Sequence, residues 1–276
     1  MSGTLDVVGI GPGSLSLMTP MAKIAISNAD FVVGYKPYLD MISPLLGGKE
    51  TSASGMTREV DRAAVAVDAA LAGRNVAIIS SGDAGMYAMG PLVYELLAQK
   101  EWKNDDTVKV TMIPGITAAN ACASLVGVPL GHDSCTISLS DLLTPMSLIE
   151  KRIEAAAVAD FAITFYNPRS RRRTEQILTA QKILLKHRHA DTPVAIVDNA
   201  YRPEQSIQIS KLSEFTDCEF GMTAAVIVGN SQSYEFENLI ITPRGYSKKY
   251  DLETGSIKAG QKRGRSLNEV QLEKVV

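Results

Sequence analysis

The sequence contains few cysteines, few aromatic side chains and no surplus of one charge. Its 276 residues include three cysteines, Cys122, Cys135 and Cys218, which lie far apart and form no C-x-x-C pair. An odd number of cysteines at this spacing argues against a disulfide framework and against a zinc or iron–sulfur site held by the protein. We therefore expect no metal ion bound by the chain itself.

The charges nearly cancel, since 28 Lys and Arg face 30 Asp and Glu, a net charge of −2. A general polyanion binder needs a basic surplus, so nucleic acid is not an expected partner. No apolar run approaches the ~18 residues of a membrane span, and the start, MSGTLDVVGIGPGS, lacks the basic segment of a signal peptide. We expect a cytoplasmic protein that does not enter membranes.

Strand and helix patterns alternate through the first 113 residues. The pattern predicts helices at about 19–28, 58–72 and 91–100, between strands at 5–10, 30–33, 76–80 and 108–113. Strands separated by helices of this length imply a parallel sheet with helices on its faces. In the helix at 58–72, we expect Thr57 to be the N-cap and one apolar stripe to face the sheet, formed by Val60, Ala64, Val67 and Leu71.

The second half has a different pattern after Pro114-Gly115, where we place a hinge. Helices are expected at 116–126, 147–157 and 171–186, and strands at 135–139, 161–166 and 194–197. Three further strands, at 206–209, 224–228 and 239–241, follow without helices and predict an antiparallel end to this sheet. The expected class is α/β, with domains at 1–113 (mainly parallel sheet) and 114–245 (mixed sheet), then a polar tail at 246–276 with one short helix.

Two glycine-rich loops follow strands of the first half. Gly9–Ser14 stands where a dinucleotide fingerprint would lie, but Ser14 replaces its third glycine and Pro12 removes a backbone donor, so a nicotinamide dehydrogenase is a weak hypothesis. Ser80–Gly90 has three glycines for close backbone approach, and Met86 and Tyr87 offer surfaces suited to a purine or a sulfonium. Taken alone, a methionine and a tyrosine next to a turn are usually core residues.

Three other segments carry polar side chains, and each has both a structural and a functional interpretation. Thr117 either caps the helix that follows it or bonds a ligand. His132 is a lone histidine, usually structural, but the neighbouring Asp133 could hold its tautomer or raise its pKa. Four arginines occupy positions 169 and 171–173, where Ser170 is expected to cap a helix, and they are either solvated or bind an anion such as a carboxylate.

Together these loops resemble those of the tetrapyrrole methylase family. The resemblance covers about residues 5 to 246, and Ser138–Pro145 is distinctive for one subgroup. The matching segments are the glycine loops at 9–13 and 82–85, the turn at 114–118, and 33–38, 55–60, 131–133, 138–145, 166–170, 225–233 and 242–246.

The resemblance implies two α/β domains with an active site between them, a homodimer, and S-adenosylmethionine as methyl donor. It implies methylation of C-17 of precorrin-3B, or its cobalt analogue, with ring contraction; any metal would arrive with the macrocycle. The implied cofactor-binding residues are Gly11, Pro12, Gly82, Asp83, Met86, Tyr87, Thr117, Ala118, Tyr166, Ala200, Asn230 and Pro243. Carboxylates of the substrate would be bound by Arg169, Arg171, Arg172 and Arg244, and the acid–base candidates are His132, Asp133 and Asp141.

Other hypotheses remain open at this point. The same fold could methylate another precorrin, an RNA or a protein, although the near-neutral charge and the Ser138–Pro145 segment argue against the last two. A non-catalytic tetrapyrrole carrier that retains the pocket belongs to a different functional class. Turnover by the purified protein would separate a carrier from an enzyme.

Overall fold

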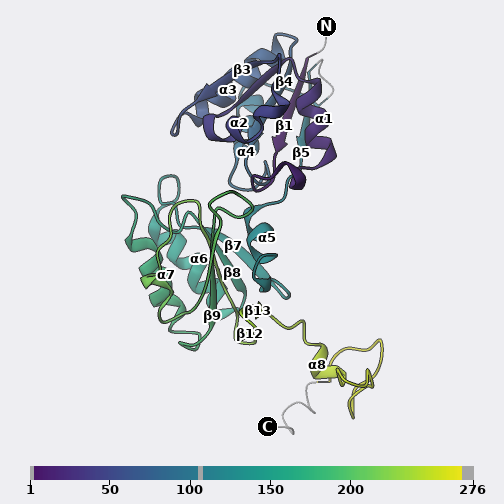
Figure 1. Ribbon diagram of the computed structural model, residues 1–276, viewed down its shortest axis with the longest axis vertical. Helices are drawn as coiled ribbons and strands as arrows, with labels where there is room; N and C mark the ends of the chain where they lie inside the picture. Colours follow the sequence, from purple (N-terminus) through teal and green to yellow (C-terminus); the bar gives the residue numbers. More distant parts are fainter. Residues whose placement is uncertain (1–2, 105–107, 269–276) are drawn as a thin grey trace.

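The computed structural model describes residues 3–104 and 108–268 and stacks two α/β halves along the long axis of the molecule (Figure 1). In the first half, five strands pair in the order β3-β2-β4-β1-β5, and every pair is parallel. The strands are β1 (Thr4–Gly9), β2 (Phe31–Tyr35), β3 (Glu50–Ser54), β4 (Asn75–Ser80) and β5 (Lys109–Ile113).

Helices cover both faces of this sheet. One face packs on α3 (Glu59–Leu71) and α4 (Met89–Gln99), and the other on α1 (Pro20–Asn28) and α2 (Lys36–Met41). Runs such as Val76–Ile79 are therefore buried on both sides, as parallel strands require. The carboxyl ends of the strands point toward the second half (Figure 1).

Helix α3 is rotated relative to the expected stripe. Its buried apolar face consists of Ala63, Ala66, Val67 and Ala70, whereas Val60 is 59% exposed and Leu71 43% exposed. The small alanines let the helix approach the sheet closely, which a stripe of valine and leucine would prevent. Thr57 is not the N-cap either: its hydroxyl donates to the Met56 carbonyl, and Arg58 holds the cap position without a side-chain bond.

The second half contains a mixed sheet in the order β10-β9-β11-β8-β7, in which only β7 and β8 are parallel. Helices α6 and α7 pack on one face and α5 on the other. The expected α/β class, with a mixed second sheet, is confirmed. The elements are α5 (Ala118–Ala123), β7 (Ser134–Ser138), α6 (Met146–Val158), β8 (Ala162–Tyr166), α7 (Glu175–Leu184), β9 (Pro193–Asp198), β10 (Ser206–Lys211) and β11 (Ala225–Val228).

Two expectations in the second half were wrong. The strand at 239–241 is not part of the second sheet: as β13 (Leu239–Ile241) it pairs with β12 (Tyr234–Phe236) and β6 (Gly127–Val128) in a small separate sheet. Helix α7 begins at Glu175, because Ser170 and Arg173 exchange two backbone hydrogen bonds in a turn before it. Ser170 is therefore not its cap, and the arginines precede the helix.

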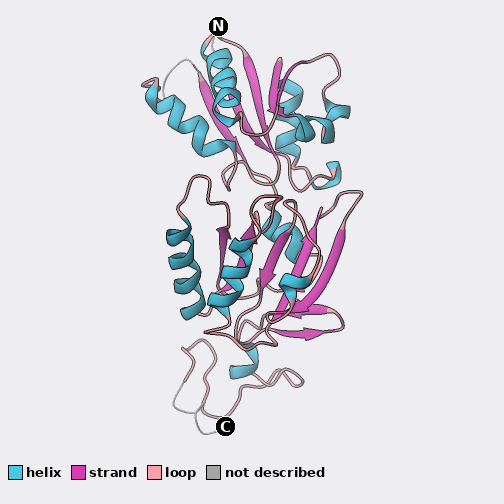
Figure 2. Ribbon diagram, turned by 90° about the vertical axis from the view of Figure 1, so that its left-hand side faces the viewer, coloured by secondary structure: helices cyan, strands magenta, loops and turns pink. Residues whose placement is uncertain are grey.

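The described part of the tail leaves the second half at its far end (Figures 1 and 2). It holds one short helix, α8 (Tyr246–Lys249), and a bridge between Tyr250 and Ile257; residues 269–276 of the predicted tail lie outside the described residues. Short 3₁₀ turns occur at Leu15–Leu17, Ser43–Leu45 and Phe215–Asp217. Within the described ranges, no helix is long and apolar enough to cross a membrane.

Candidate functional site

Three loops meet at the carboxyl ends of β1 and of its two neighbours in the sheet, β4 and β5. Their backbones are in direct contact: a Cβ added to Gly115 would lie 2.1 Å from the Gly82 carbonyl oxygen and 2.8 Å from that of Gly9. Only glycine fits such a packing. Ligands of open α/β sheets bind outside this edge, so the three loops form the candidate site.

Backbone hydrogen bonds join the first two loops. The Gly11 N–H donates to the Gly82 carbonyl at 3.0 Å, and the Gly82 N–H donates to the Gly11 carbonyl at 2.8 Å. Both residues have left-handed backbone, with φ of +75° and +67°, which glycine adopts without strain. The Gly9–Ser14 loop therefore serves to hold the second loop, a different geometry from the dinucleotide fingerprint.

Asp83 connects the second loop to the third. One carboxylate oxygen accepts from the Gly85 N–H at 2.8 Å, and the other accepts from the Gly115 N–H at 3.0 Å. The carboxylate therefore fixes loop geometry through both oxygens. Its role in the structure is to position backbone.

Tyr166, at the end of β8, brings the second half onto the third loop. Its hydroxyl oxygen accepts from the Ala119 N–H at 2.6 Å and lies 2.5 Å from the Thr117 hydroxyl. The Thr117 hydroxyl also lies 3.1 Å from Met86 Sδ, so it stands between the second loop and Tyr166. Thr117 thus makes no side-chain cap. Its position between the loops agrees with the other interpretation, in which its hydroxyl bonds a ligand.

Tyr87 joins the second loop to the free edge of β7. Its hydroxyl donates to the Thr136 carbonyl at 3.1 Å and accepts from the Ser138 N–H at 3.3 Å. Its ring meets the Tyr166 ring edge-on, with centroids 5.6 Å apart, and its backbone has the left-handed φ of +51°. Strained backbone of this kind is typical of functional sites.

A hollow of about 600 Å³ opens beside Tyr87. It is bounded by Gly85, Met86, Tyr87 and Pro91 of the first half and by Ser134, Cys135 and Thr136 on β7. This volume lies within the range of small-molecule sites in proteins. The hollow places methionine sulfur and an aromatic ring next to open space at the junction of the halves.

Burial raises the pKa of two acidic groups in this region, Tyr166 and Cys122. It raises the pKa of the Tyr166 phenol, and hydrogen bonds from Thr117 and Ala119 oppose that shift only in part. It also raises the pKa of the Cys122 thiol, on α5, to about 12. A thiol with this pKa is not a nucleophile at neutral pH, so Cys122 is a core residue.

Ten of the twelve predicted cofactor residues lie at this junction. The carboxyl ends of β8 and β9 share one edge of the second sheet, because both strands run antiparallel to β11, and Ala200 follows β9 there. The ten residues are Gly11, Pro12, Gly82, Asp83, Met86, Tyr87, Thr117, Ala118, Tyr166 and Ala200.

Asn230 and Pro243 are not brought to these ten. Asn230 follows β11, whose last residue Val228 pairs with Ile163 near the start of β8. The adjacent Ser231 bonds Asp160, which precedes β8, and Pro243 follows Thr242, which contacts Ser233. A five-residue strand spans ~13 Å, so both residues lie at the opposite edge of the sheet from Tyr166.

The acid–base candidates lie at two ends of β7. His132 and Asp133 precede the strand: the Asp133 N–H donates to His132 Nδ1 at 2.7 Å, and its carbonyl accepts from Ala162, the first residue of β8. Asp141 follows the other end, where its carboxylate accepts from Gln176 at 3.0 Å. Only Asp141 is therefore at the edge that carries Tyr166.

The predicted anion-binding arginines also separate. Arg169 donates to the carbonyls of Thr216 and Cys218 and stacks over the Phe220 ring at 4.4 Å, so it holds a loop. Arg171 and Arg172 are exposed in the turn before α7. Arg244 follows Pro243 at the far edge, next to the tail.

Sequence reasoning missed three residues of the junction. Gly9 and Gly115 supply the backbone contact described above, and Arg202 reaches from the second half to the first two loops. The signal for the glycines was their position directly after a strand, at Gly9 and in Pro114-Gly115. Arg202 has no such local signal, because its contacts are 121 and 190 residues away in sequence.

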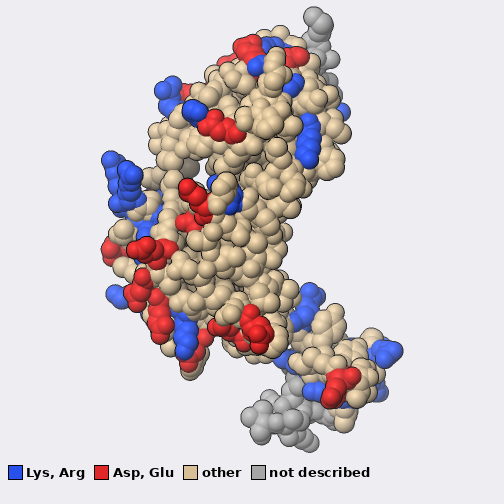
Figure 3. Space-filling view, viewed as in Figure 1, with Lys and Arg blue, Asp and Glu red and all other residues tan. Residues whose placement is uncertain are grey.

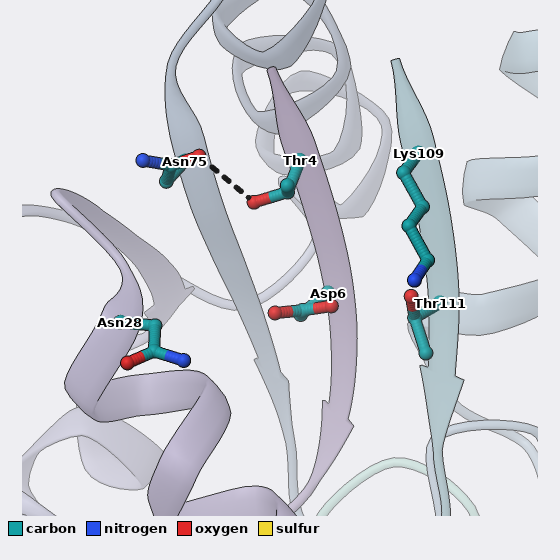
Figure 4. Close-up of a pocket in the computed structure, with 6 residues that line it drawn as sticks. All are labelled: Thr4, Asp6, Asn28, Asn75, Lys109 and Thr111. Carbon is teal, nitrogen blue, oxygen red and sulfur yellow. Dashed lines mark hydrogen bonds between the residues drawn. The ribbon is translucent and has the colours of Figure 1, made fainter. Parts of the chain in front are cut away.

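A second hollow, of about 350 Å³, lies at the opposite end of the first sheet (Figure 4). Its lining is polar and consists of Thr4, Asp6, Asn28, Asn75, Lys109 and Thr111. Burial raises the pKa of the half-buried Asp6 carboxyl, against a hydrogen bond from Thr111 and the charge of Lys109. This hollow is separated from the glycine loops by the length of the strands.

Two further features of the molecule are the charges on one face of its surface and the metal-ligating side chains of the described residues. On the face drawn in Figure 3, acidic and basic side chains are interspersed over both halves. Within 3–104 and 108–268, no three His, Cys, Asp or Glu side chains are grouped so as to hold a metal ion.

Comparison with known proteins identifies close relatives. The model of the family Tetrapyrrole (Corrin/Porphyrin) Methylases matches residues 4–216. The chain is 53% identical over 252 residues to the cobalt-factor III methyltransferase of Priestia megaterium, covering 91% of this chain and 47% of that protein. It is 48% identical over 243 residues to the probable cobalt-factor III C(17)-methyltransferase of Salmonella typhimurium, covering 88% and 99%.

A solved structure agrees with these matches. The crystal structure of the methyltransferase CobJ superposes with a TM-score of 0.81 at 36% identity, covering 88% of this chain and 100% of that one. The chain thus spans about half the length of the Priestia relative and almost the whole of the other two. Both halves are included in each match.

Proposed function

Because the chain belongs to the tetrapyrrole (corrin/porphyrin) methylases, we propose that it is an S-adenosylmethionine-dependent methyltransferase that methylates C-17 of a precorrin-3-level tetrapyrrole with ring contraction. The observation that carries this proposal is the 48% identity to the Salmonella relative, which extends over 99% of that protein. The names of the two relatives favour cobalt-factor III as the substrate over the cobalt-free precorrin-3B.

The residues at the junction fit this methyl donor. Gly9 and Gly115 let the backbones of the loops pack directly on one another, which fixes the loops, while Met86 and Tyr87 border open space, and aromatic faces attract a sulfonium. In our proposal the ten residues from Gly11 to Ala200 hold the donor, and Asn230 and Pro243 are left out because they lie at the other edge. Bound there, the donor supplies an electrophilic methyl group.

The protein's own contribution is mainly positioning. The nucleophile is an electron-rich carbon of the macrocycle, so the chain must hold that carbon in line with the methyl group. Burial raises the pKa of Tyr166 above its ordinary value, which already lies well above neutral pH, and its hydrogen bonds fix Thr117 and the start of α5. Tyr87 closes the junction on the β7 side.

Carboxylates of the macrocycle would bind to the arginine turn before α7. Arg171 and Arg172 are exposed there, and Arg173 Nη1 is buried without a hydrogen-bond partner, as expected of a group that awaits an anion. For the proton movements of ring contraction, Asp141 is the best-placed candidate, ahead of His132 and Asp133, because it shares the edge with Tyr166.

We further propose the features that the relatives leave open: two domains meeting near residue 113, a homodimer, a cytoplasmic location, and no nucleic-acid or membrane partner. Size-exclusion chromatography with light scattering tests the dimer.

Calorimetry and product analysis test the function. The pure protein should bind S-adenosylhomocysteine, and with S-adenosylmethionine it should convert cobalt-factor III to a product one methyl group heavier by mass spectrometry. Conversion of precorrin-3B alone would reassign the substrate, and binding of pigment without consumption of the methyl donor would indicate a carrier. Absence of S-adenosylhomocysteine binding would overturn the proposal.

A further inference from the structure

Arg202 lies in the turn that follows β9 and reaches across the junction to the first half. Its Nε donates to the Pro12 carbonyl at 2.7 Å, and its Nη2 donates to the Ser81 hydroxyl at 3.0 Å. Pro12 belongs to the first glycine loop and Ser81 to the second. One guanidinium therefore binds both loops that Gly11 and Gly82 already join.

Gly13 is shaped around this arginine. A Cβ at Gly13 would lie 2.7 Å from Arg202 Cγ and 2.9 Å from its Nε, and the φ of +144° is one that other residues rarely adopt. The Pro12–Gly13 peptide is planar and trans, so its carbonyl and N–H point in opposite directions. By holding the carbonyl, Arg202 fixes the direction of the Gly13 N–H, a backbone donor of the loop.

Hydrogen bonds brace the turn that carries Arg202. Asn199 and Tyr201 both have left-handed backbone, with φ of +50° and +59° on either side of Ala200. The Tyr201 N–H donates to the Gln205 side chain at 2.7 Å, and the Tyr201 hydroxyl lies 2.8 Å from that of Ser124. A strained turn braced in this way keeps its position, and the position of its arginine with it.

Other contacts between the halves involve the later part of the second loop. The Thr117 hydroxyl bonds Met86 Sδ, and Tyr87 binds the edge of β7. Arg202 contacts the first loop and the start of the second. Both acceptors are neutral, and hydrogen bonds from a charged donor are the stronger kind.

We propose that Arg202 is a positioning residue, which fixes the Gly9–Ser14 loop and Ser81 to the turn carrying Ala200 and so sets the shape of the methyl-donor site. This inference rests on the proposed function for the identity of the ligand. The mechanical part, that Arg202 orders the two loops, does not depend on any ligand.

Hydrogen exchange of the free protein tests the mechanical part. In Arg202→Ala, exchange of the Gly11, Gly13 and Gly82 amides should rise about tenfold or more, because two charge-assisted hydrogen bonds are lost. Arg202→Lys should lie between, since a single ammonium cannot span both acceptors as a guanidinium does. Ser81→Ala, which removes one acceptor, should show a smaller rise. Arg152→Ala, on the exposed face of α6, is the matched control.

Calorimetry with S-adenosylhomocysteine tests the link to the site. We expect about 10- to 100-fold weaker binding in Arg202→Ala, with a KM for S-adenosylmethionine that rises more than kcat falls. If Arg202→Ala does not fold, Arg202→Lys and Ser81→Ala carry the test. The inference would be overturned if all three variants stayed within about twofold of Arg152→Ala, both in amide exchange rates and in affinity for S-adenosylhomocysteine. A parent protein that fails to bind S-adenosylhomocysteine, while exchange still rises in Arg202→Ala, would instead refute the proposed function alone.

Discussion

The two ends of the first sheet differ in the kind of polar group that they present. The amino end gathers side chains that look functional, including Asp6, Lys109 and Thr111 around a hollow of about 350 Å³. The carboxyl end is built from glycines, and its polar groups are mostly backbone N–H and C=O. Yet it is the carboxyl end that the second half contacts, through Arg202 and through the ring of Tyr166 against Tyr87.

The length of α1 explains the amino end. The helix stops at Asn28 and covers Val8 and Ile10 further along β1, so the first residues of the strands have no apolar layer over them. Figure 4 shows the side chains of Thr4, Asp6 and Lys109 on this uncovered face. Polar residues are the expected composition of a face in contact with water. A polar cluster is therefore weaker grounds for a site than close-packed backbone under a second domain.

The largest effect should come from adding one methyl group at the carboxyl end. In Gly115→Ala the new Cβ meets the Gly82 carbonyl oxygen at 2.1 Å, so the loops must separate. We expect methyl transfer to fall more than about 100-fold and the free energy of unfolding to drop by about 1–3 kcal/mol. Enzyme assay and urea denaturation measure both. Gly47→Ala, which has open space around it, is the control; equal activity in the two variants would mean that the loop contact is not needed.

A moderate effect is expected in Tyr166→Phe. The change leaves the buried Ala119 N–H without its acceptor and the Thr117 hydroxyl without its partner, at a cost of about 1–3 kcal/mol. Binding of S-adenosylhomocysteine should weaken about tenfold in calorimetry. Tyr234→Phe, at an exposed position on β12, should bind as the parent does, and a matching affinity in Tyr166→Phe would argue against its place in the site.

Substitution of the exposed arginines should change the KM for the tetrapyrrole and leave binding of the methyl donor unchanged. Arg171→Ala and Arg172→Ala should each raise the KM for the tetrapyrrole several-fold, since each removes one bond to a carboxylate in a solvated place. Affinity for S-adenosylhomocysteine should not change. If the affinity for S-adenosylhomocysteine fell while the tetrapyrrole KM stayed unaltered, these arginines would bind the methyl donor and not the tetrapyrrole.

The smallest effect is expected from a substitution at the amino end of the sheet, Asp6→Asn. The pKa of Asp6 is raised by burial, so its stabilising protonated form is fully present below pH 3.8 and is lost as the pH rises through the folded-state pKa. Asp6→Asn should therefore be slightly more stable than the parent at pH 7, by no more than about 0.5 kcal/mol because the group is half exposed, and equal to it near pH 3. Thermal unfolding at both pH values checks the sign. Methyl transfer should be unaltered, and a large loss of activity would contradict the comparison between the ends.

The sequence predicted the fold class and most of the strands, because buried parallel strands such as Val76–Ser80 have a clear apolar pattern. It missed β3, whose residues Glu50–Ser54 are polar, since an edge strand has few apolar side chains. The orientation of α3 was also unpredictable: alanines and valines offered two apolar stripes, and only packing against the sheet selects between them.

For the candidate site, the sequence located the loops but not the contacts between them. Gly82 and Thr117 were identified by their position after strands. The role of Asp83 as a link to Gly115 depends on a contact 32 residues away in sequence. The separation of Asn230 from Tyr166 depends on β11 lying antiparallel beside β8, a neighbour that no local pattern identifies.

Amide chemical shifts recorded during a titration with S-adenosylhomocysteine test the central claim most directly. The account predicts large shifts for Gly11, Gly82 and Thr117, and none for Thr4 or Asp6 at the opposite end of the same strands. Shifts concentrated around Thr4 and Asp6, with the glycine loops unperturbed, would contradict it.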